Sequence, residues 1–177
     1  MDWKDKFRIV NSCIDTNEDI EQDFYIKSEG APNDFVLKLK AIYPFVTEDY
    51  LQFLEMTDGA DIAQCRFLEA NNFDSFAEQY GQSYPKKSWM PIGYEAGGDP
   101  LLLHKNGKIA LGEGKANKEV FTFLASNFSE FISEVLMGQR YASIFRIEKG
   151  EFNEFYEDEL DDDPWLAFLI QNQWVRI

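Results

Sequence analysis

An Asn-Gly pair between two apolar runs constrains the fold of this chain most strongly. Asn106-Gly107 separates residues 101–105, which contain three leucines, from residues 108–112, which contain isoleucine, alanine and leucine. Asparagine and glycine both tolerate the positive φ that the two central positions of a type I′ turn require. The pattern predicts a β-hairpin with a type I′ turn, and it places an antiparallel pair of strands in this part of the chain.

Helical spacing of apolar residues occurs on both sides of this hairpin. Short helices are predicted before it, over residues 2–10, 33–42, 47–58 and 73–80, and after it from Asn127 to Gly138 and in the tail. Asn33 and Thr47 are predicted N-caps, and Asn127 with Glu130 has the spacing of a capping box.

Residues 62–68 and 120–124 are predicted as further strands, whereas residues 11–30 are polar and show no clear periodicity. Helices, then strands, then helices favour an α+β fold. We expect a largely antiparallel sheet with helices packed on one side, and a helical, acidic C-terminal extension. The length of 177 residues is typical of a single domain over residues 1–177.

The formal net charge of −15 is unevenly distributed along the chain. Residues 15–34 carry seven acidic side chains against Lys27, and residues 148–163 carry nine against Lys149, while acids and bases cancel over residues 60–118. Such a field repels nucleic acid and anionic membranes and attracts basic partners. The alternative interpretation is that the acidity only keeps the protein soluble.

Three features indicate a cytoplasmic protein. Cys13 and Cys65 have the spacing of neither a disulfide framework nor a zinc site, which suits a reducing compartment. The first ten residues contain charges and no apolar core of a signal peptide. Apolar stretches such as residues 165–170 are far too short to span a membrane.

A catalytic site is not indicated by any motif. His104, the one histidine, precedes the hairpin turn, where a structural role is expected, and no serine occupies a nucleophile elbow. The acidic run 157–163 lacks the ligand pattern of a calcium loop, and Glu113 stands where a phosphate loop needs lysine. We therefore expect no enzymatic activity, no cofactor and no metal.

Four short segments occur in an order that resembles the pattern of a known family. They are Tyr43-Pro44 with the helix Thr47-Glu48-Asp49-Tyr50-Leu51-Gln52-Phe53-Leu54, then Met90-Pro91-Ile92-Gly93, then Gly97-Gly98-Asp99, and last Ser126-Asn127-Phe128-Ser129-Glu130-Phe131-Ile132. Together they resemble the SUKH superfamily, named partly for the Smi/Knr-type domain of cell-wall-assembly regulators.

The resemblance covers about residues 32–137, which leaves an N-terminal segment, 1–31, and a C-terminal extension, 139–177. Two departures from the family pattern occur. Val46-Thr47 replaces the proline that precedes the helix acids, and Pro100 rather than an aromatic residue follows Asp99.

The resemblance implies an α+β fold and, for most bacterial members, immunity to a toxin delivered by contact or by a polymorphic toxin system. Such a protein binds a toxin domain and blocks it. The expected partner is therefore a protein, and the net charge favours a basic toxin domain. A regulatory or scaffold domain, as the eukaryotic members suggest, is the alternative, and an unrecognised hydrolase is a third hypothesis.

The partner-binding residues are hypothesised in two places. The first is the glycine turn with its flanking residues, and the second is the acidic run of the tail. The residues are Tyr94, Glu95, Gly98, Asp99, Asp161, Asp162 and Asp163. For the glycines, the turn itself is an alternative explanation.

Overall fold

The computed structural model describes residues 1–14, 17–115 and 118–177, so the first two residues of the acidic segment 15–34 lie outside the described residues. The helices are α1 (Trp3–Cys13), η2 (Glu18–Ile20), α2 (Asn33–Ile42), α3 (Glu48–Met56), α4 (Phe73–Tyr80), α5 (Phe128–Glu130), η3 (Phe131–Leu136), η4 (Tyr141–Phe145), η5 (Lys149–Glu151), α6 (Phe152–Glu159) and α7 (Pro164–Gln171). The strands are β1 (Phe24–Ile26), β2 (Ala60–Ile62), β3 (Cys65–Phe67), β4 (Trp89–Glu95), β5 (Pro100–His104), β6 (Ile109–Gly112) and β7 (Phe121–Ala125).

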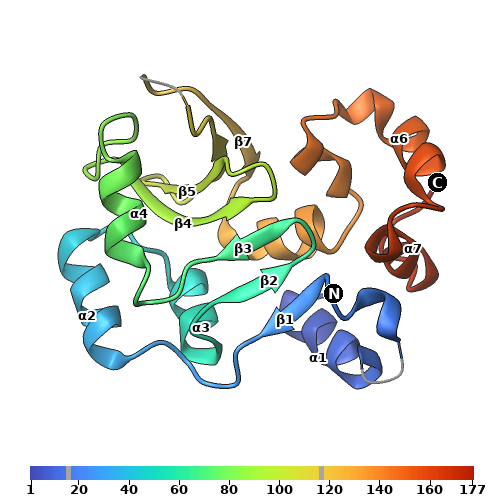
Figure 1. The fold of residues 1–177 in the computed structure, drawn as a ribbon, viewed down its shortest axis with the longest axis horizontal. Helices are drawn as coiled ribbons and strands as arrows, with labels where there is room; N and C mark the ends of the chain where they lie inside the picture. Colours follow the sequence, from blue (N-terminus) through green and yellow to red (C-terminus); the bar gives the residue numbers. More distant parts are fainter. Residues whose placement is uncertain (15–16, 116–117) are drawn as a thin grey trace.

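In the described residues, seven strands form one sheet in which each strand pairs antiparallel with the next along the chain (Figure 1). The α+β prediction with an antiparallel sheet is confirmed. Pro91 is tolerated in the middle of β4 because the register shifts between Pro91 and Gly93. A side chain at Gly93 would meet the carbonyl of Arg66 at 2.3 Å, so β3 approaches β4 here only because residue 93 is glycine.

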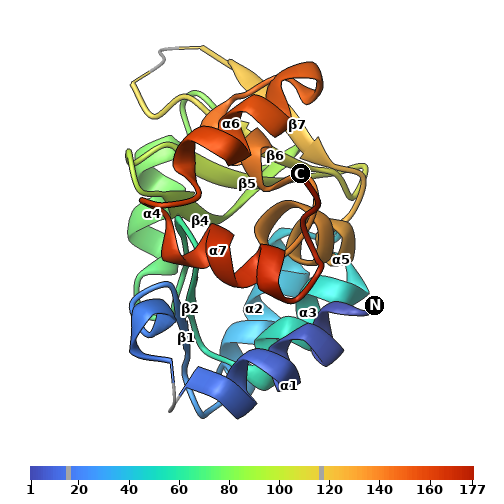
Figure 2. The same cartoon turned by 90° about the vertical axis from the view of Figure 1, so that its right-hand side faces the viewer.

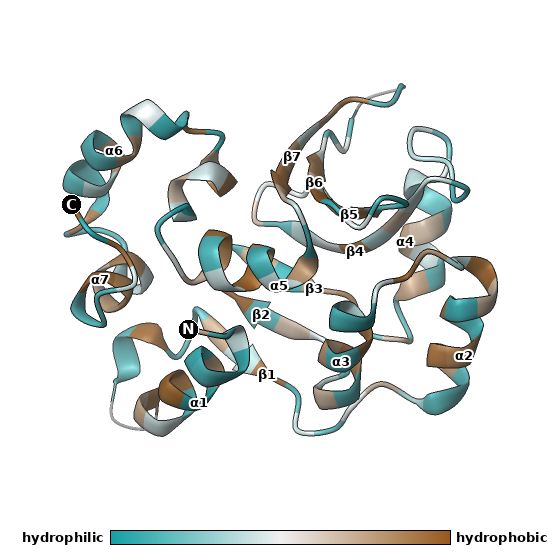
Figure 3. Cartoon of the chain, turned by 180° about the vertical axis from the view of Figure 1, so that it is seen from behind, coloured by the Kyte–Doolittle hydropathy of each residue, from teal (hydrophilic) through white to brown (hydrophobic). Residues whose placement is uncertain are grey.

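Helices α1, α3 and α5 cover one face of the sheet (Figure 3). One continuous buried cluster joins them, with Trp3 of α1, Phe53 of α3, Phe128 of α5 and Trp165 of α7 among its members. The N-terminal segment and the C-terminal extension therefore share the core of residues 32–137. Helix α4 lies on the other face, where Tyr80 joins a smaller cluster with Tyr84, Trp89, Leu102 and Ala110.

Lys6 fastens the N-terminal helix to the rest of the molecule. Its ammonium group is buried and donates to the carbonyls of Ser133, at 2.7 Å, and Met137, at 2.5 Å. It also lies 4.8 Å from the centre of the Trp174 ring. Burial lowers the pKa of this lysine, and the nearby charge of Glu134 opposes that effect. A single cation thus links α1, η3 and the C-terminal end of the chain.

The hairpin of β5 and β6 is present, but the prediction of a type I′ turn is wrong. Gly107 has a φ of +85°, whereas the φ of Asn106 is not positive. The Gly107 N–H donates to the His104 carbonyl, and the Asn106 side chain accepts from the Lys108 N–H at 3.1 Å. This is a three-residue loop with glycine in the left-handed position, the second common hairpin connection.

The prediction of one continuous strand over residues 62–68 is wrong. Residues 60–67 form a hairpin of β2 and β3, with Ala63 at a φ of +53° in the turn. Neither turn residue is glycine, asparagine or proline, so the usual signal for a turn is missing. Strand β1 and helix η2 also lie in the stretch 11–30 that showed no periodicity.

The predicted helix ends are correct in part. Pro32, not Asn33, is the N-cap of α2, and Thr47 occupies the N-cap of α3 without a side-chain cap bond. Asn127 does accept from the Glu130 N–H, at 2.8 Å. After Glu130 the helix widens into the π-helix η3, which the apolar spacing did not distinguish from an α-helix.

Candidate functional site

Tyr94, Glu95, Gly98 and Asp99 lie together at the turn from β4 to β5. The Glu95 carboxylate accepts from the N–H groups of Gly97 and Asp99, at 2.8 and 2.9 Å. Gly98 has a φ of +90°, a conformation that favours glycine. The glycine and both acids thus make the turn.

Asp99 also holds the turn to distant parts of the chain. One of its carboxylate oxygens accepts from the Gly114 N–H at 2.8 Å, and the other forms an ion pair with Arg146 of the C-terminal extension. A hollow of about 560 Å³ lies beside these residues and includes Gly98 in its lining. A partner could reach this hollow, but the Asp99 carboxylate has structural bonds on both oxygens.

Tyr94 points away from that hollow toward α4 and β3. Its ring stacks on Phe76 of α4 with a centroid distance of 5.1 Å. A second hollow, of about 290 Å³, extends from Tyr94 and Glu95 to Gln22, which lies between η2 and β1. This part of the predicted site therefore borders the N-terminal acidic segment.

The three consecutive aspartates of the tail have different surroundings. Asp163 is half-buried and caps α7 by accepting from the Leu166 N–H at 2.9 Å, while its other oxygen accepts from the Tyr141 hydroxyl at 2.9 Å. Asp161 and Asp162 are exposed. Of the three predicted residues, Asp161 and Asp162 are accessible to a partner, whereas Asp163 holds the extension together.

The fold brings the two acidic segments side by side, which sequence reasoning treated as separate. Helix η2 packs against α7, and both lie on the end of the molecule that faces the viewer in Figure 2. A hollow of about 380 Å³ between them is lined by Asp19 on one side and Leu160, Asp161 and Phe168 on the other. Two acidic side chains, one from each segment, thus line the same hollow together with apolar and amide side chains.

We call the exposed carboxylates of residues 18–21 and of residues 157–162 the acidic surface; Asp19 and Asp161 among them line the hollow. Its members are Glu18, Asp19, Glu21, Glu157, Asp158, Glu159, Asp161 and Asp162. Within residues 1–14, 17–115 and 118–177, none of them forms an ion pair. Their charge is therefore available to a partner. No signal in the sequence pointed to this convergence, because it depends on the packing of η2 on α7.

Asp23 of the N-terminal segment and Asp163 of the C-terminal extension interact where the two segments meet. Burial is the main cause that raises the pKa of Asp23 to about 6, and the charge of Asp163 adds to it. Burial, and then the charge of Asp163, raise the pKa of the Tyr141 hydroxyl, which stays protonated and donates to Asp163.

The other chemical groups have packing roles. His104 lies 4.5 Å from the Trp89 ring, measured between centroids, and its Nδ1 accepts from the Asn106 N–H at 3.4 Å. In the part of the chain that the structure describes, no three His, Cys, Asp or Glu side chains are grouped to hold a metal ion. Of the described helices, none has the length and apolar character needed to cross a membrane.

Comparison with known families identifies one family whose sequence pattern the chain matches. Residues 43–134, just over half of the chain, match the SMI1/KNR4 family (SUKH-1). The match begins at the end of α2 and ends in η3, so it contains the turn at Gly98 and excludes the acidic surface. No curated protein matches the sequence.

Proposed function

The chain belongs to the SMI1/KNR4 family (SUKH-1), and we propose that it is a non-enzymatic immunity protein that binds a cognate toxin and blocks it. Family membership suggests binding to another protein. The specific proposal, a basic toxin domain as partner, is supported by the acidic surface that the N-terminal segment and the C-terminal extension build together.

The proposal rests mainly on one observation: the carboxylates of the acidic surface form no ion pairs among the described residues. Eight exposed carboxylates gather at one end of the molecule without an ion pair among the described residues. A surface of this kind attracts a basic protein from a distance and increases the rate of association. Toxin domains that act on nucleic acids carry basic surfaces, so the same charges would compete with the substrate.

The shape of the acidic surface adds a short-range component. The hollow between η2 and α7 is lined by Leu160, Pro164 and Phe168 together with the carboxylates of Asp19 and Asp161. A lysine or arginine side chain can place its methylene groups against such apolar side chains and its charge beside the carboxylates. The site therefore suits a partner that presents long basic side chains.

Co-expression with the product of the neighbouring reading frame tests the proposal. We expect a stable one-to-one complex on size exclusion, and we expect cells that carry this chain to survive expression of that product. A complex without protection would favour the alternative, a regulatory or scaffold domain. Absence of both binding and protection would contradict the proposed function.

A further inference from the structure

A second charged surface lies around the hairpin of β5 and β6. The three segments 85–90, 104–108 and 118–123 together contain five lysines and one acid, Glu119. All five lysines are exposed, and among the described residues none of them forms an ion pair. We call these lysines the basic surface: Lys86, Lys87, Lys105, Lys108 and Lys118. In a chain of net charge −15, this surface has the opposite sign to the acidic surface.

A cluster of rings joins the three segments. The Trp89 ring lies 4.5 Å from the ring of His104 and 4.7 Å from that of Phe121, measured between centroids. The Trp89 indole N–H also donates to the carboxylate of Glu119 at 2.9 Å. The five lysines therefore flank one cluster, although they come from separate parts of the chain.

Part of this cluster is open to a partner. Phe121 and Phe123 of β7 are 36% and 39% exposed, and their ring centroids are 5.0 Å apart. The ammonium group of Lys108 lies 5.0 Å from the centre of the Phe123 ring. The basic surface thus presents an exposed ring and an unpaired positive charge side by side.

The hollow between η2 and α7 has the complementary chemistry. Its lining contains the apolar side chains of Leu160 and Phe168 beside the carboxylates of Asp19 and Asp161. These two aspartates are exposed and have no ion pair in the part of the chain that the structure describes. The chain therefore carries both halves of a matching contact, in charge and in apolar character.

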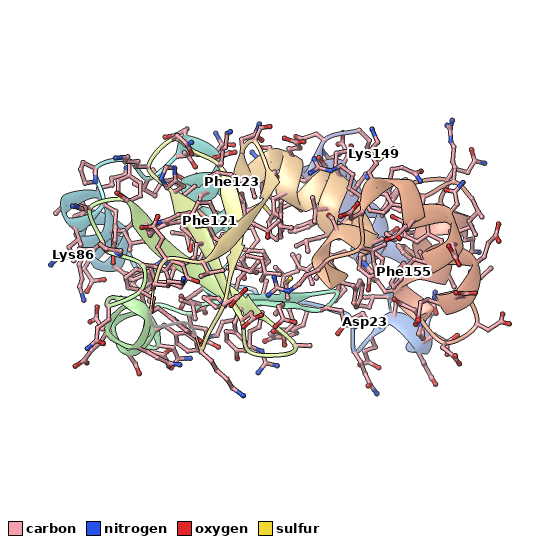
Figure 4. The ribbon with its side chains drawn as sticks, turned by 90° about the horizontal axis from the view of Figure 1, so that it is seen from above. Asp23, Lys86, Phe121, Phe123, Lys149 and Phe155 are labelled. Carbon is pink, nitrogen blue, oxygen red and sulfur yellow. The ribbon has the colours of Figure 1, made fainter. Side chains whose placement is uncertain are left out.

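The two surfaces lie too far apart to meet within one molecule. Figure 4 shows Lys86, Phe121 and Phe123 in one half of the molecule, and Asp23 and Phe155 in the other. Asp23 and Phe155 are each two residues from a member of the acidic surface. One copy therefore cannot close the contact on itself, but two copies can form it.

We propose that the basic surface of one copy binds the acidic surface of a second copy, with Phe123 and Lys108 placed at the hollow between η2 and α7. Such a contact is heterologous, so every added copy leaves one free surface at each end and the assembly can grow. Repulsion between two copies of net charge −15 is screened beyond about 8 Å near physiological ionic strength, so the charges at the contact dominate.

This contact regulates access to the acidic surface. A second copy covers the carboxylates that the proposed toxin partner would bind, so the two compete. The inference uses the acidic surface of the proposed function, but it does not depend on the identity of the toxin.

Sedimentation velocity of the purified full chain tests whether copies associate. The concentration is raised from about 1 to 300 μM, the range in which a weak contact forms, at about 100 mM salt. We expect the weight-average sedimentation coefficient to rise with concentration and to pass the value of a dimer, because a heterologous contact continues beyond two copies.

Two charge-reversed variants test which surfaces meet. Lys105→Glu with Lys108→Glu reverses part of the basic surface, and Asp19→Lys with Asp161→Lys reverses part of the acidic surface; all four positions are exposed. Each variant alone should self-associate about tenfold more weakly or less. An equimolar mixture should form a complex that stops at one copy of each, because each variant keeps the surface that the other has lost.

Matched controls separate this contact from general charge and apolar effects. Lys40→Glu with Lys149→Glu makes the same change in net charge at exposed lysines outside the basic surface, and it should alter self-association by less than about twofold. Phe123→Ser should weaken self-association by about fivefold, whereas Leu37→Ser, at an exposed apolar position of α2, should change it by less than about twofold.

Three results would overturn the proposal. The first is a single monomeric species at every concentration, which would leave the basic surface to a different acidic partner. The second is a dimer that does not grow, since that indicates a symmetric contact. The third is a mixture of the two charge-reversed variants that fails to combine. All these measurements use the free protein, so their failure leaves the co-expression test of the proposed function unaffected.

Discussion

Asp23 of the N-terminal segment lies within electrostatic reach of Asp163 of the C-terminal extension, and this charge adds to burial in raising the pKa of Asp23 to about 6. Asp163 is held in place by the Leu166 N–H and the Tyr141 hydroxyl. The two carboxylates mark the junction at which the acidic segments meet. The fold therefore holds like charges together, which opposes folding and leaves charge available for a partner.

The first prediction concerns the pH dependence of stability. The pKa of Asp23 is about 6 in the folded protein against 3.8 ordinarily. Its contribution is fully present below about pH 3.8 and is lost as the pH rises through about 6, because the folded state binds the proton more tightly. Asp23→Asn should therefore stabilise the protein by about 1 kcal/mol at pH 7.5, after allowance for partial solvent exposure, and by little near pH 4.

Urea unfolding at the two pH values measures this difference. Asp19→Asn, an exposed residue of the acidic surface, is the matched control and should show a smaller change with pH. An equal gain for Asp23→Asn at both pH values would contradict the assignment.

The second prediction separates two neighbouring aspartates. Asp163→Ala should cost about 1–2 kcal/mol, because it removes the cap of α7 and the acceptor of the Tyr141 hydroxyl. Asp162→Ala should change stability by less than about 0.5 kcal/mol, since its side chain is exposed. Chemical denaturation of both variants checks the difference, and similar losses would show that Asp163 does not have this role.

The third prediction concerns the hairpin turn. Gly107 has a φ of +85°, so Gly107→Val should destabilise the protein by about 1 kcal/mol or more. Gly150→Val, at a position with open space around it, should cost less than about 0.5 kcal/mol. Thermal unfolding compares the two, and an unchanged melting temperature for Gly107→Val would mean that the loop relaxes into another conformation.

The fourth prediction concerns the buried lysine. Lys6→Met should cost about 2 kcal/mol or more, because the carbonyls of Ser133 and Met137 lose their donor. Lys40→Met, at an exposed position, should change stability by less than about 0.5 kcal/mol. If urea unfolding shows the two substitutions to be equivalent, Lys6 does not fasten α1 to the core.

The local structure was predictable where one short segment determines it. Asn127 and Asp163 cap their helices because the acceptor and the N–H lie within three residues of each other. Gly107 was identified as a turn residue, but the exact loop was not, since an Asn-Gly pair fits two kinds of hairpin connection. The β2–β3 turn was missed because Ala63 carries no turn signal.

The candidate site was less predictable for a physical reason. Asp161 and Asp162 were named from the charge of the tail, yet their position beside Asp19 depends on the packing of η2 against α7. Contacts between segments so far apart along the chain leave no periodic pattern. For the same reason the hydrogen bond that Asp163 accepts from the Tyr141 hydroxyl could not be predicted, although its place as the cap of α7 follows from the Asp163-Pro164 pair.

The central claim is that the acidic surface steers a basic partner to this protein. The rate of association with the product of the neighbouring reading frame, measured by stopped-flow fluorescence as salt rises from about 20 to 500 mM, tests it most directly. Two triple variants are compared. The acidic-surface variant combines Asp19→Asn, Asp161→Asn and Asp162→Asn. The control variant combines Glu55→Gln, Glu78→Gln and Glu113→Gln, which removes the same charge from exposed positions elsewhere.

We expect association of the unmodified protein to slow by about tenfold or more over this range, with a smaller change in dissociation. The acidic-surface variant should associate about fivefold more slowly at low salt and should show a weaker salt dependence, whereas the control variant should remain close to the unmodified protein. Association that is independent of salt, or that slows equally in both variants, would contradict the claim.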